Sequence, residues 1–169
     1  MKRSAWLLLL VSLLNMQCGY RLAGRGRNLP ASAKTIAIPE FQNETSRYQA
    51  QPFVSAAIRE EFIKRSRLRL VAAVDKADLV LEGRIGAFET TPVAYSDHGT
   101  AKMCDLHITV HVRLIDLKNN EIVYEVSGLA FRATYETDAV DFFSQAAGSL
   151  EKIGSRFAAS VVSSILDNF

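Results

Sequence analysis

The sequence has few of the residues that build disulfide frameworks and metal centres. Only two of its 169 residues are cysteines, Cys18 and Cys104, and only three are histidines. Two cysteines allow at most one bridge, which excludes a disulfide-rich scaffold. His107 and His111 lie four residues apart on a predicted strand, about 13 Å from each other and too far for two ligands of one zinc ion. We therefore expect no metal and no other cofactor.

Catalytic motifs are also missing from the sequence. It contains no Gly-x-Ser-x-Gly elbow, no Cys-x-x-Cys pair and no glycine-rich phosphate loop. The adjacent carboxylates of Glu60 and Glu61 fall on a predicted helix, where neighbouring side chains diverge by about 100° and do not form an acid–base pair. We predict that the protein is not an enzyme.

The chain lacks a real excess of either charge. It has 20 Lys and Arg against 18 Asp and Glu. Lys2 and Arg3 belong to a leader without acids, and removing that leader leaves 18 residues of each sign. Proteins that bind nucleic acid normally carry a strong positive excess, so no nucleic acid partner is expected.

The first residues form an export signal. Lys2 and Arg3 precede an apolar run over residues 5–14, after which the sequence turns polar and small. This run is half of the roughly 20 residues that a membrane-spanning helix requires. Cys18 follows the run after three intervening residues and predicts a signal peptide over residues 1–17 and acylation of Cys18, as in bacterial lipoproteins. A plain secretory signal followed by an unmodified cysteine remains the alternative.

A basic segment links this anchor to the folded part of the chain. Residues 18–34 contain four cations, three of the chain's glycines and no acid, which predicts a tether that can approach anionic lipid. A flexible linker without a role at the membrane surface is the alternative. Its cations are Arg21, Arg25, Arg27 and Lys34.

Residues 35–169 are predicted to form one domain that contains strands and helices. The predicted strands cover residues 35–39, 68–71, 78–88, 104–116 and 122–133. The predicted helices cover residues 52–66, with Pro52 in the first turn, and 139–167, with Asp138 as a cap.

Strand 104–116 has the clearest pattern in the chain. Apolar side chains alternate with polar ones from Cys104 to Leu114, which is typical of an antiparallel sheet with one packed and one exposed face. Cys104 lies on the apolar side and is expected to be a buried small residue. The fold class is therefore α+β: a two-layer sandwich with two helices packed on one face of a mostly antiparallel four- to five-stranded sheet.

Several short motifs, in this order, resemble those of the outer-membrane lipoproteins of lipopolysaccharide (LPS) assembly, the LptE family. The resemblance extends over the whole chain after the signal. The motifs are Cys18-Gly19-Tyr20-Arg21-Leu22, Leu29-Pro30, Ile36-Ala37-Ile38-Pro39 with Phe41, Asn43 and Thr45, and Ala77-Asp78-Leu79-Val80-Leu81 with Gly83.

This resemblance implies a lipoprotein that is lipid-anchored through Cys18 at the outer membrane and faces the periplasm. It also implies a protein that plugs the LPS-translocating β-barrel LptD, helps that barrel to assemble, and assists insertion of LPS into the outer leaflet. Two other classes remain open: a pilot lipoprotein for a different outer-membrane pore, and a small exported ligand-binding domain.

Direct contact with LPS phosphates would need Lys or Arg on exposed strand ends or loops. The candidates within the predicted sheet are Arg84, Lys102, Arg113 and Arg132. Residues 90–101 are predicted to form a loop that contacts the barrel wall, and a long hairpin connection is the alternative.

Overall fold

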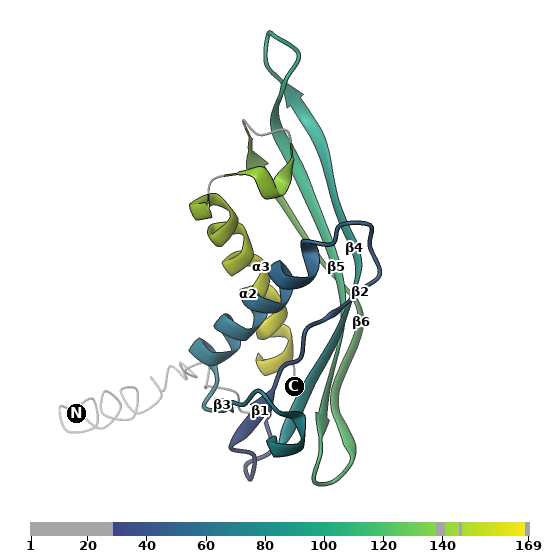
Figure 1. Ribbon diagram of the computed structural model, residues 1–169, viewed down its shortest axis with the longest axis vertical. Coiled ribbons are helices and arrows are strands. Elements are labelled where there is room, and N and C mark those ends of the chain that lie inside the picture. The colour runs from purple at the N-terminus through teal and green to yellow at the C-terminus, as the bar shows by residue number, and fades with distance from the viewer. Residues whose placement is uncertain (1–28, 138–140, 146, 168–169) are drawn as a thin grey trace, which may run out of the picture.

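The computed structural model describes residues 29–137, 141–145 and 147–167. The sheet is built from three short and three long strands, and two helices and two short 3-10 turns complete the fold (Figure 1). The strands are β1 (Thr35–Ala37), β2 (Gln42–Asn43), β3 (Arg69–Leu70), β4 (Leu79–Tyr95), β5 (Ala101–Asp116) and β6 (Glu121–Glu136). The helices are α2 (Ala50–Arg65) and α3 (Ala147–Asp167), and the 3-10 turns are η1 (Val74–Lys76) and η2 (Phe142–Ser144).

The long strands form an antiparallel meander, and the short ones add to it in parallel. The strand order is β3-β1-β4-β5-β6, and β2 pairs with β4 beside β1. Both helices lie on the same face of this sheet (Figure 1). The two-layer α+β class is therefore confirmed, with six strands because the two-residue β2 adds to the expected set.

The core forms where the alternating strand pattern meets the helical stripes. On β5, Leu106, Ile108 and Val110 are fully buried beneath the helices. On α3, Phe157, Val161 and Ile165 recur every four residues and pack from the other side. Each buried side chain of this size contributes roughly 1.5–3 kcal/mol. Cys104 is buried and free, as its place on the apolar side of the strand predicted.

The prediction of a loop over residues 90–101 is wrong in extent. β4 continues to Tyr95, which pairs with Ala101, so the connection has only five residues, 96–100. The turn closes through a 2.8 Å bond from the backbone N–H of Ser96 to the carbonyl of Thr100, and Gly99 adopts a φ of 76°. Pro92 is accommodated at a register shift of β4, where a strand tolerates a missing N–H. The alternative of a long hairpin connection is wrong for the same reason: the strands are long and the connection between them is short.

The predicted start of the last helix is also wrong. α3 begins at Ala147, and the preceding described residues form η2, capped by the Asp141 carboxylate, which accepts a 3.1 Å bond from the N–H of Phe143. The ring of Phe142 lies 5.3 Å from that of Phe88, and Phe143 stacks on Phe88 at 5.2 Å. These contacts place both rings against β4, which a continuous helix would not allow. The expected cap Asp138 lies outside the described residues.

The chain enters the fold along a buried segment. Leu29 and Ala33 are both 5% exposed and belong to the core, so the last six residues of the predicted tether pack against the domain. The rest of that tether, including Cys18, lies outside the described residues.

Asp78 ties this entry point to the sheet. Its Oδ2 accepts bonds from the backbone N–H groups of Lys34 (2.8 Å) and Thr35 (3.0 Å), and its Oδ1 lies 2.8 Å from the Lys118 ammonium. The hydroxyl oxygen of Thr35 in turn accepts a 2.9 Å hydrogen bond from the backbone N–H of Asp78. The pKa of Asp78 lies far below its usual range. The hydrogen bond from the Lys118 ammonium is the largest cause, and the bonds from the two backbone N–H groups come next.

Gly83 makes room for an aromatic ring. A Cβ at this position would lie 2.1 Å from the ring of Phe41, whose side chain is completely buried. Both residues belong to the motifs that carried the family resemblance. Their pairing therefore has a packing reason: the segment between β1 and β2 lies on β4 because position 83 has no side chain.

We expect Gly83→Ala to lower the free energy of unfolding by about 1–3 kcal/mol, because the added methyl group must displace a packed ring. Urea unfolding of the two proteins measures the difference. Gly148→Ala is the matched control, since nothing lies within 4 Å of a Cβ there. Equal stability of Gly83→Ala and wild type would contradict the contact.

We expect Asp78→Asn to lower the melting temperature at pH 7, with the difference shrinking below about pH 4, where a free Asp becomes protonated. A depressed native pKa stabilises the fold above the unfolded-state pKa, and this stabilisation disappears as the pH falls toward the native value. Thermal unfolding at several pH values tests this. Asp75→Asn removes a nearby exposed carboxylate and serves as the control. A difference between Asp78→Asn and wild type that does not change with pH would contradict the stabilising role of the Asp78 carboxylate.

Candidate functional site

The face of the sheet opposite the helices carries polar side chains along all three long strands. We call it the outer sheet face. Cross-strand partners point to the same side, so the register places its members in rows. The polar members are Glu82, Arg84, Glu89, Thr91, Asp105, His107, Thr109, His111, Arg113, Glu125, Arg132 and Thr134.

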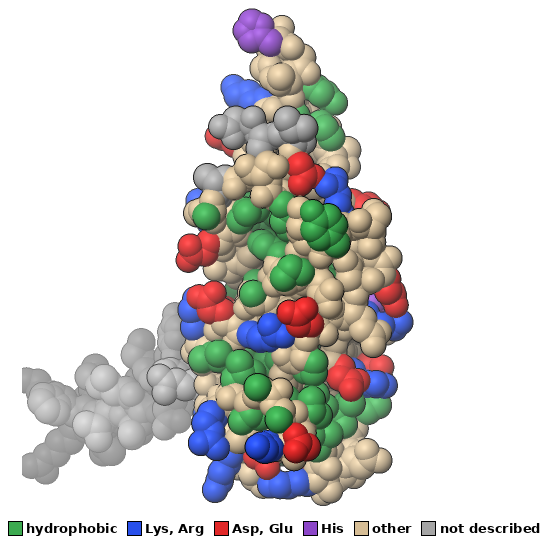
Figure 2. Space-filling model, in the orientation of Figure 1, with side chains coloured by type: hydrophobic (Ala, Val, Ile, Leu, Met, Phe, Trp, Pro, Cys, Tyr) green, Lys and Arg blue, Asp and Glu red, His purple; other side chains and the backbone are tan. Residues whose placement is uncertain are grey.

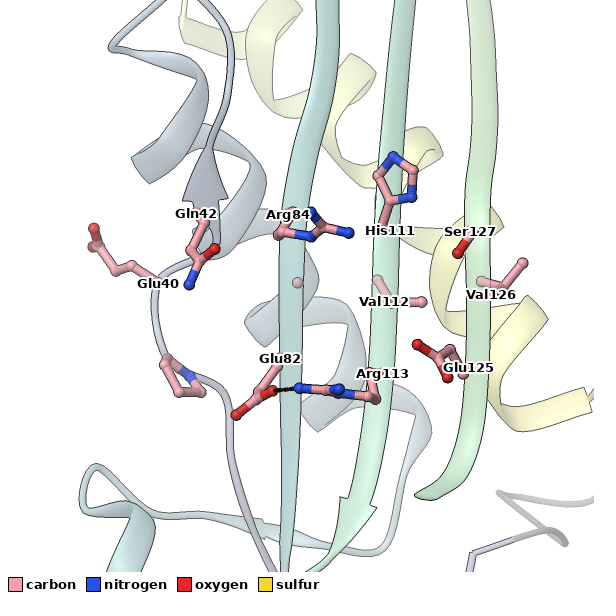
Figure 3. A pocket seen from close by; sticks show the side chains of 12 residues that line it. Glu40, Gln42, Glu82, Arg84, His111, Val112, Arg113, Glu125, Val126 and Ser127 are labelled. Carbon is pink, nitrogen blue, oxygen red and sulfur yellow. Dashed lines mark hydrogen bonds and ion pairs between the residues drawn. The ribbon is translucent and has the colours of Figure 1, made fainter. Parts of the chain in front are cut away.

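One row consists of two acids on either side of an arginine. Arg113 on β5 pairs in register with Glu82 on β4 and with Glu125 on β6. The Arg113 guanidinium lies 2.8 Å from the Glu82 carboxylate, and Figure 3 shows this contact as a dashed line. The hydrogen bond to Glu82 raises the pKa of Arg113 further, so its charge is permanent and locally neutralised.

In a second row, around His107, one arginine has no acidic partner among the described residues. His107 on β5 lies opposite Glu89 and Arg132, with its Nδ1 4.0 Å from the Glu89 carboxylate. The hydroxyl of Thr109 lies 3.3 Å from its other ring nitrogen. In the described ranges 29–137, 141–145 and 147–167, the side chain of Arg132 forms no ion pair.

The first row borders an open depression of about 550 Å³. Figure 3 shows Arg84, His111 and Arg113 over its centre, with Gln42 and Glu40 on one side and Glu125 and Ser127 on the other. Small-molecule sites are usually enclosed and mainly apolar, which this polar depression is not.

Two contacts hold the upper part of the depression in place. Arg84 lies 3.1 Å from the carboxylate of Glu44, just beyond β2. Nδ1 of His111 accepts a 3.2 Å bond from the N–H of Gly128. Both basic side chains are therefore held by neighbours from distant parts of the sequence.

The four basic candidates do not form one site. Arg84 and Arg113 line the same depression and have acidic partners (Figure 3). Lys102 lies at a register shift near the start of β5, five residues from the row of Arg132, a separation of about 16 Å along the strand. Lys102 is exposed, and within the described part of the chain its side chain has no ion pair.

The hairpin of β4 and β5 extends beyond the helical layer and carries exposed apolar side chains (Figure 1). Val93 is 50% exposed and Tyr95 is 63% exposed. With Lys102 and the turn 96–100, these two residues form what we call the hairpin tip. Val93 was not among the residues expected at a site, although its place in a Thr, Val and Tyr segment is a strand signal.

The acidic partners Glu44, Glu82 and Glu125 were also missed. Opposite charges at alternate positions of consecutive predicted strands are a signal that could have indicated the pairing, but only with the register known. Glu60, by contrast, pairs with Lys64 at 2.7 Å as an exposed helix pair, which is a surface arrangement.

The described residues offer neither a metal site nor a membrane-spanning helix. Among the residues that the structure describes, no group of three or more His, Cys, Asp and Glu could hold a metal ion. No helix in these same ranges is both long enough and apolar enough to cross a membrane.

Solved structures share this α+β fold. PelC from Paraburkholderia phytofirmans, a dodecamer, superposes with a TM-score of 0.55 at 17% identity, covering 81% of this chain and 91% of that one. The hypothetical protein CT253 from Chlamydia trachomatis gives 0.51 at 13% identity, covering 82% and 100%. At such low identity these similarities show the fold alone. No curated protein matches the sequence.

The family itself comes from a match to a family model. The lipopolysaccharide-assembly model, LptE, matches residues 33–166, which is most of the chain. The protein therefore belongs to the LptE family, and the sequence resemblance is confirmed. It is an outer-membrane lipoprotein of the family that serves LPS transport.

We expect Glu82→Gln to change the free energy of unfolding by less than about 1 kcal/mol, because exposed ion pairs contribute little to stability. Urea unfolding measures the change, with Gly83→Ala at the next position as a destabilising reference. A loss above about 2 kcal/mol would mean that this row holds the sheet together rather than forming a surface.

Proposed function

We propose that the protein occupies the lumen of the LPS-translocating β-barrel LptD, supports its assembly and assists insertion of LPS into the outer leaflet. Acylation of Cys18 holds it at the outer membrane on the periplasmic side. Membership of the LptE family over residues 33–166 is the observation that carries the proposal.

The outer sheet face is suited to such a position. The interior of a large outer-membrane barrel is polar and hydrated. A surface whose charges are already paired, as in Glu82–Arg113 and Glu44–Arg84, can be enclosed there without needing a counter-charge at every position. Water bridges can supply the remaining contacts across such an interface.

The hairpin tip is suited to contact with the barrel wall. It extends past the helices, so it can reach a surrounding surface before the rest of the domain does. Val93 and Tyr95 offer apolar area there, and the phenol group of Tyr95 adds a hydrogen-bonding end.

Lys102 and Arg132 are the better candidates for LPS phosphates among the four basic residues. Arg84 and Arg113 already have carboxylate partners, whereas Lys102 and Arg132 have none within the described residues. Lys102 at the hairpin tip and Arg132 on β6, about 16 Å apart along the strands, are therefore two separate proposed contacts with LPS.

Co-purification tests the barrel partnership. We expect affinity-tagged protein extracted from outer membranes in detergent to bring LptD with it, and the peptide containing Cys18 to have the mass of the acylated form. Recovery of another pore would favour the pilot alternative, and recovery of an unacylated monomer would contradict the proposal.

We expect the double variant Lys102→Ala and Arg132→Ala to bind LPS about tenfold more weakly or worse, since each lost cation removes a charge-assisted contact. Binding of labelled LPS to purified protein measures this, and an unchanged circular dichroism spectrum verifies the fold. The control removes the exposed Lys152 and Arg156 of α3. Unchanged affinity in the first variant would remove both residues from the proposed site.

A further inference from the structure

The end of the molecule opposite the hairpin tip carries a second group of exposed cations. Lys34, Arg67, Arg69 and Lys76 lie on the segments 29–38 and 67–76, where Asp75 is the one acid. We call these four residues the basic corner. Figure 2 shows blue side chains gathered at this lower end, and Figure 1 shows β1 and β3 there.

Backbone contacts bring the segments of the basic corner together. The N–H of Arg69 donates a 2.9 Å bond to the carbonyl of Lys34, and the Arg67 guanidinium donates to the carbonyl of Pro30 at 3.3 Å. The hydroxyl of Thr35 donates to the carbonyl of Lys76 at 3.5 Å. The four cations are therefore held in one region by the fold, although they come from segments more than 30 residues apart.

These cations are not neutralised by their surroundings. In the described part of the chain, none of the four side chains forms an ion pair. Asp75 supplies a single negative charge against the four cations. The other two nearby acids are engaged: Asp78 forms an ion pair with Lys118, and Asp116 is buried and accepts from the backbone N–H groups of the turn after β5. The outer sheet face differs, because its arginines at 84 and 113 are paired.

Exposed apolar side chains flank the basic corner. Val74 in η1 is 41% exposed and Leu117 is 37% exposed. Val74 lies two residues from Lys76, and the N–H of Leu117 bonds to the carbonyl of Asp78, which brings it beside Thr35. Cations next to apolar side chains are typical of surfaces that rest in a membrane interface.

The described part of the chain begins at Leu29, beside the basic corner. Pro30 contacts the basic corner through the Arg67 guanidinium, and Cys18 precedes Leu29 by only 11 residues, at most about 39 Å of extended chain. Residues 19–28 add Arg21, Arg25 and Arg27 and no acid. An acyl group at Cys18 therefore keeps the basic corner within reach of the membrane that holds it.

We infer that the basic corner docks on the phosphate groups of anionic phospholipid in the leaflet that holds the N-terminus. The inference rests on the proposed anchoring at Cys18. Each cation near an anionic surface gains attraction that falls off within a Debye length, so the contact depends on salt. It orients the domain with the hairpin tip, and the proposed LPS contact of Lys102, at the far end from the bilayer anchor.

Vesicle binding of the full chain with Cys18→Ser tests the docking without an acyl group. Partition is measured onto phosphatidylcholine vesicles with and without phosphatidylglycerol, and the ratio of the two values cancels the apolar contribution of the leader. We expect Arg67→Gln with Arg69→Gln to lower this ratio about thirty-fold at low salt, and 0.5 M salt to abolish most of the difference.

The matched control is Lys152→Gln with Arg156→Gln, which removes the same charge from the exposed side of α3 and should leave the ratio within about twofold. An equal fall in both variants would mean that net charge alone drives binding and would overturn the inference. Binding to vesicles that contain LPS but not to those with phosphatidylglycerol would overturn it as well. Co-purification of LptD with the Arg67→Gln, Arg69→Gln variant reads out the proposed function separately.

Discussion

Strand β5 is buried on one face only, and most of the molecule follows from that constraint. Its even-numbered side chains from Leu106 to Leu114 require a cover, which the apolar stripes of α2 and α3 supply. Because β5 lies between β4 and β6, the register extends the same division to both neighbours. The opposite face is left to water or to a partner, and it carries rows of opposite charges instead of an apolar patch. A domain built in this way can be enclosed by a hydrated cavity without burying an unpaired charge in each row.

The short parallel strands have a different role, which is to fasten the start of the domain to this sheet. Asp78 binds the backbone at Lys34 and Thr35, while Gly83 accepts the ring of Phe41. These contacts determine where the chain enters the fold, and therefore at which end of the domain the N-terminal segment begins. The two ends consequently differ: the basic corner lies beside the entry point, and the hairpin tip extends away from it. The fold thus gives the domain two chemically different ends.

Much of the secondary structure could be predicted from local patterns, and the errors have physical causes. The alternation from Cys104 to Leu114 and the helical stripe from Phe157 to Ile165 were strong enough to identify both layers. Residues 90–95 were misread as a loop because Pro92 is a strand breaker in most contexts, whereas a register shift accommodates it here. Phe143 was placed on a helix because its spacing fits the stripe of α3, but its ring stacks on Phe88 in a 3-10 turn instead. In both cases a long-range contact outweighed a local preference.

The sequence by itself determined the two-layer architecture, the polar character of the exposed sheet face and the family, because each of these depends on periodicity or on short motifs along the chain. Only the tertiary structure decided which charges are neutralised. Arg113 and Arg84 are paired with carboxylates 31 and 40 residues away, whereas Lys102 and Arg132 are left without such partners in the described residues. The basic corner likewise depends on β1 and β3 lying side by side. Ion pairing depends on distances of a few ångströms between side chains, and these distances are set by strand register and packing, which residue order does not reveal.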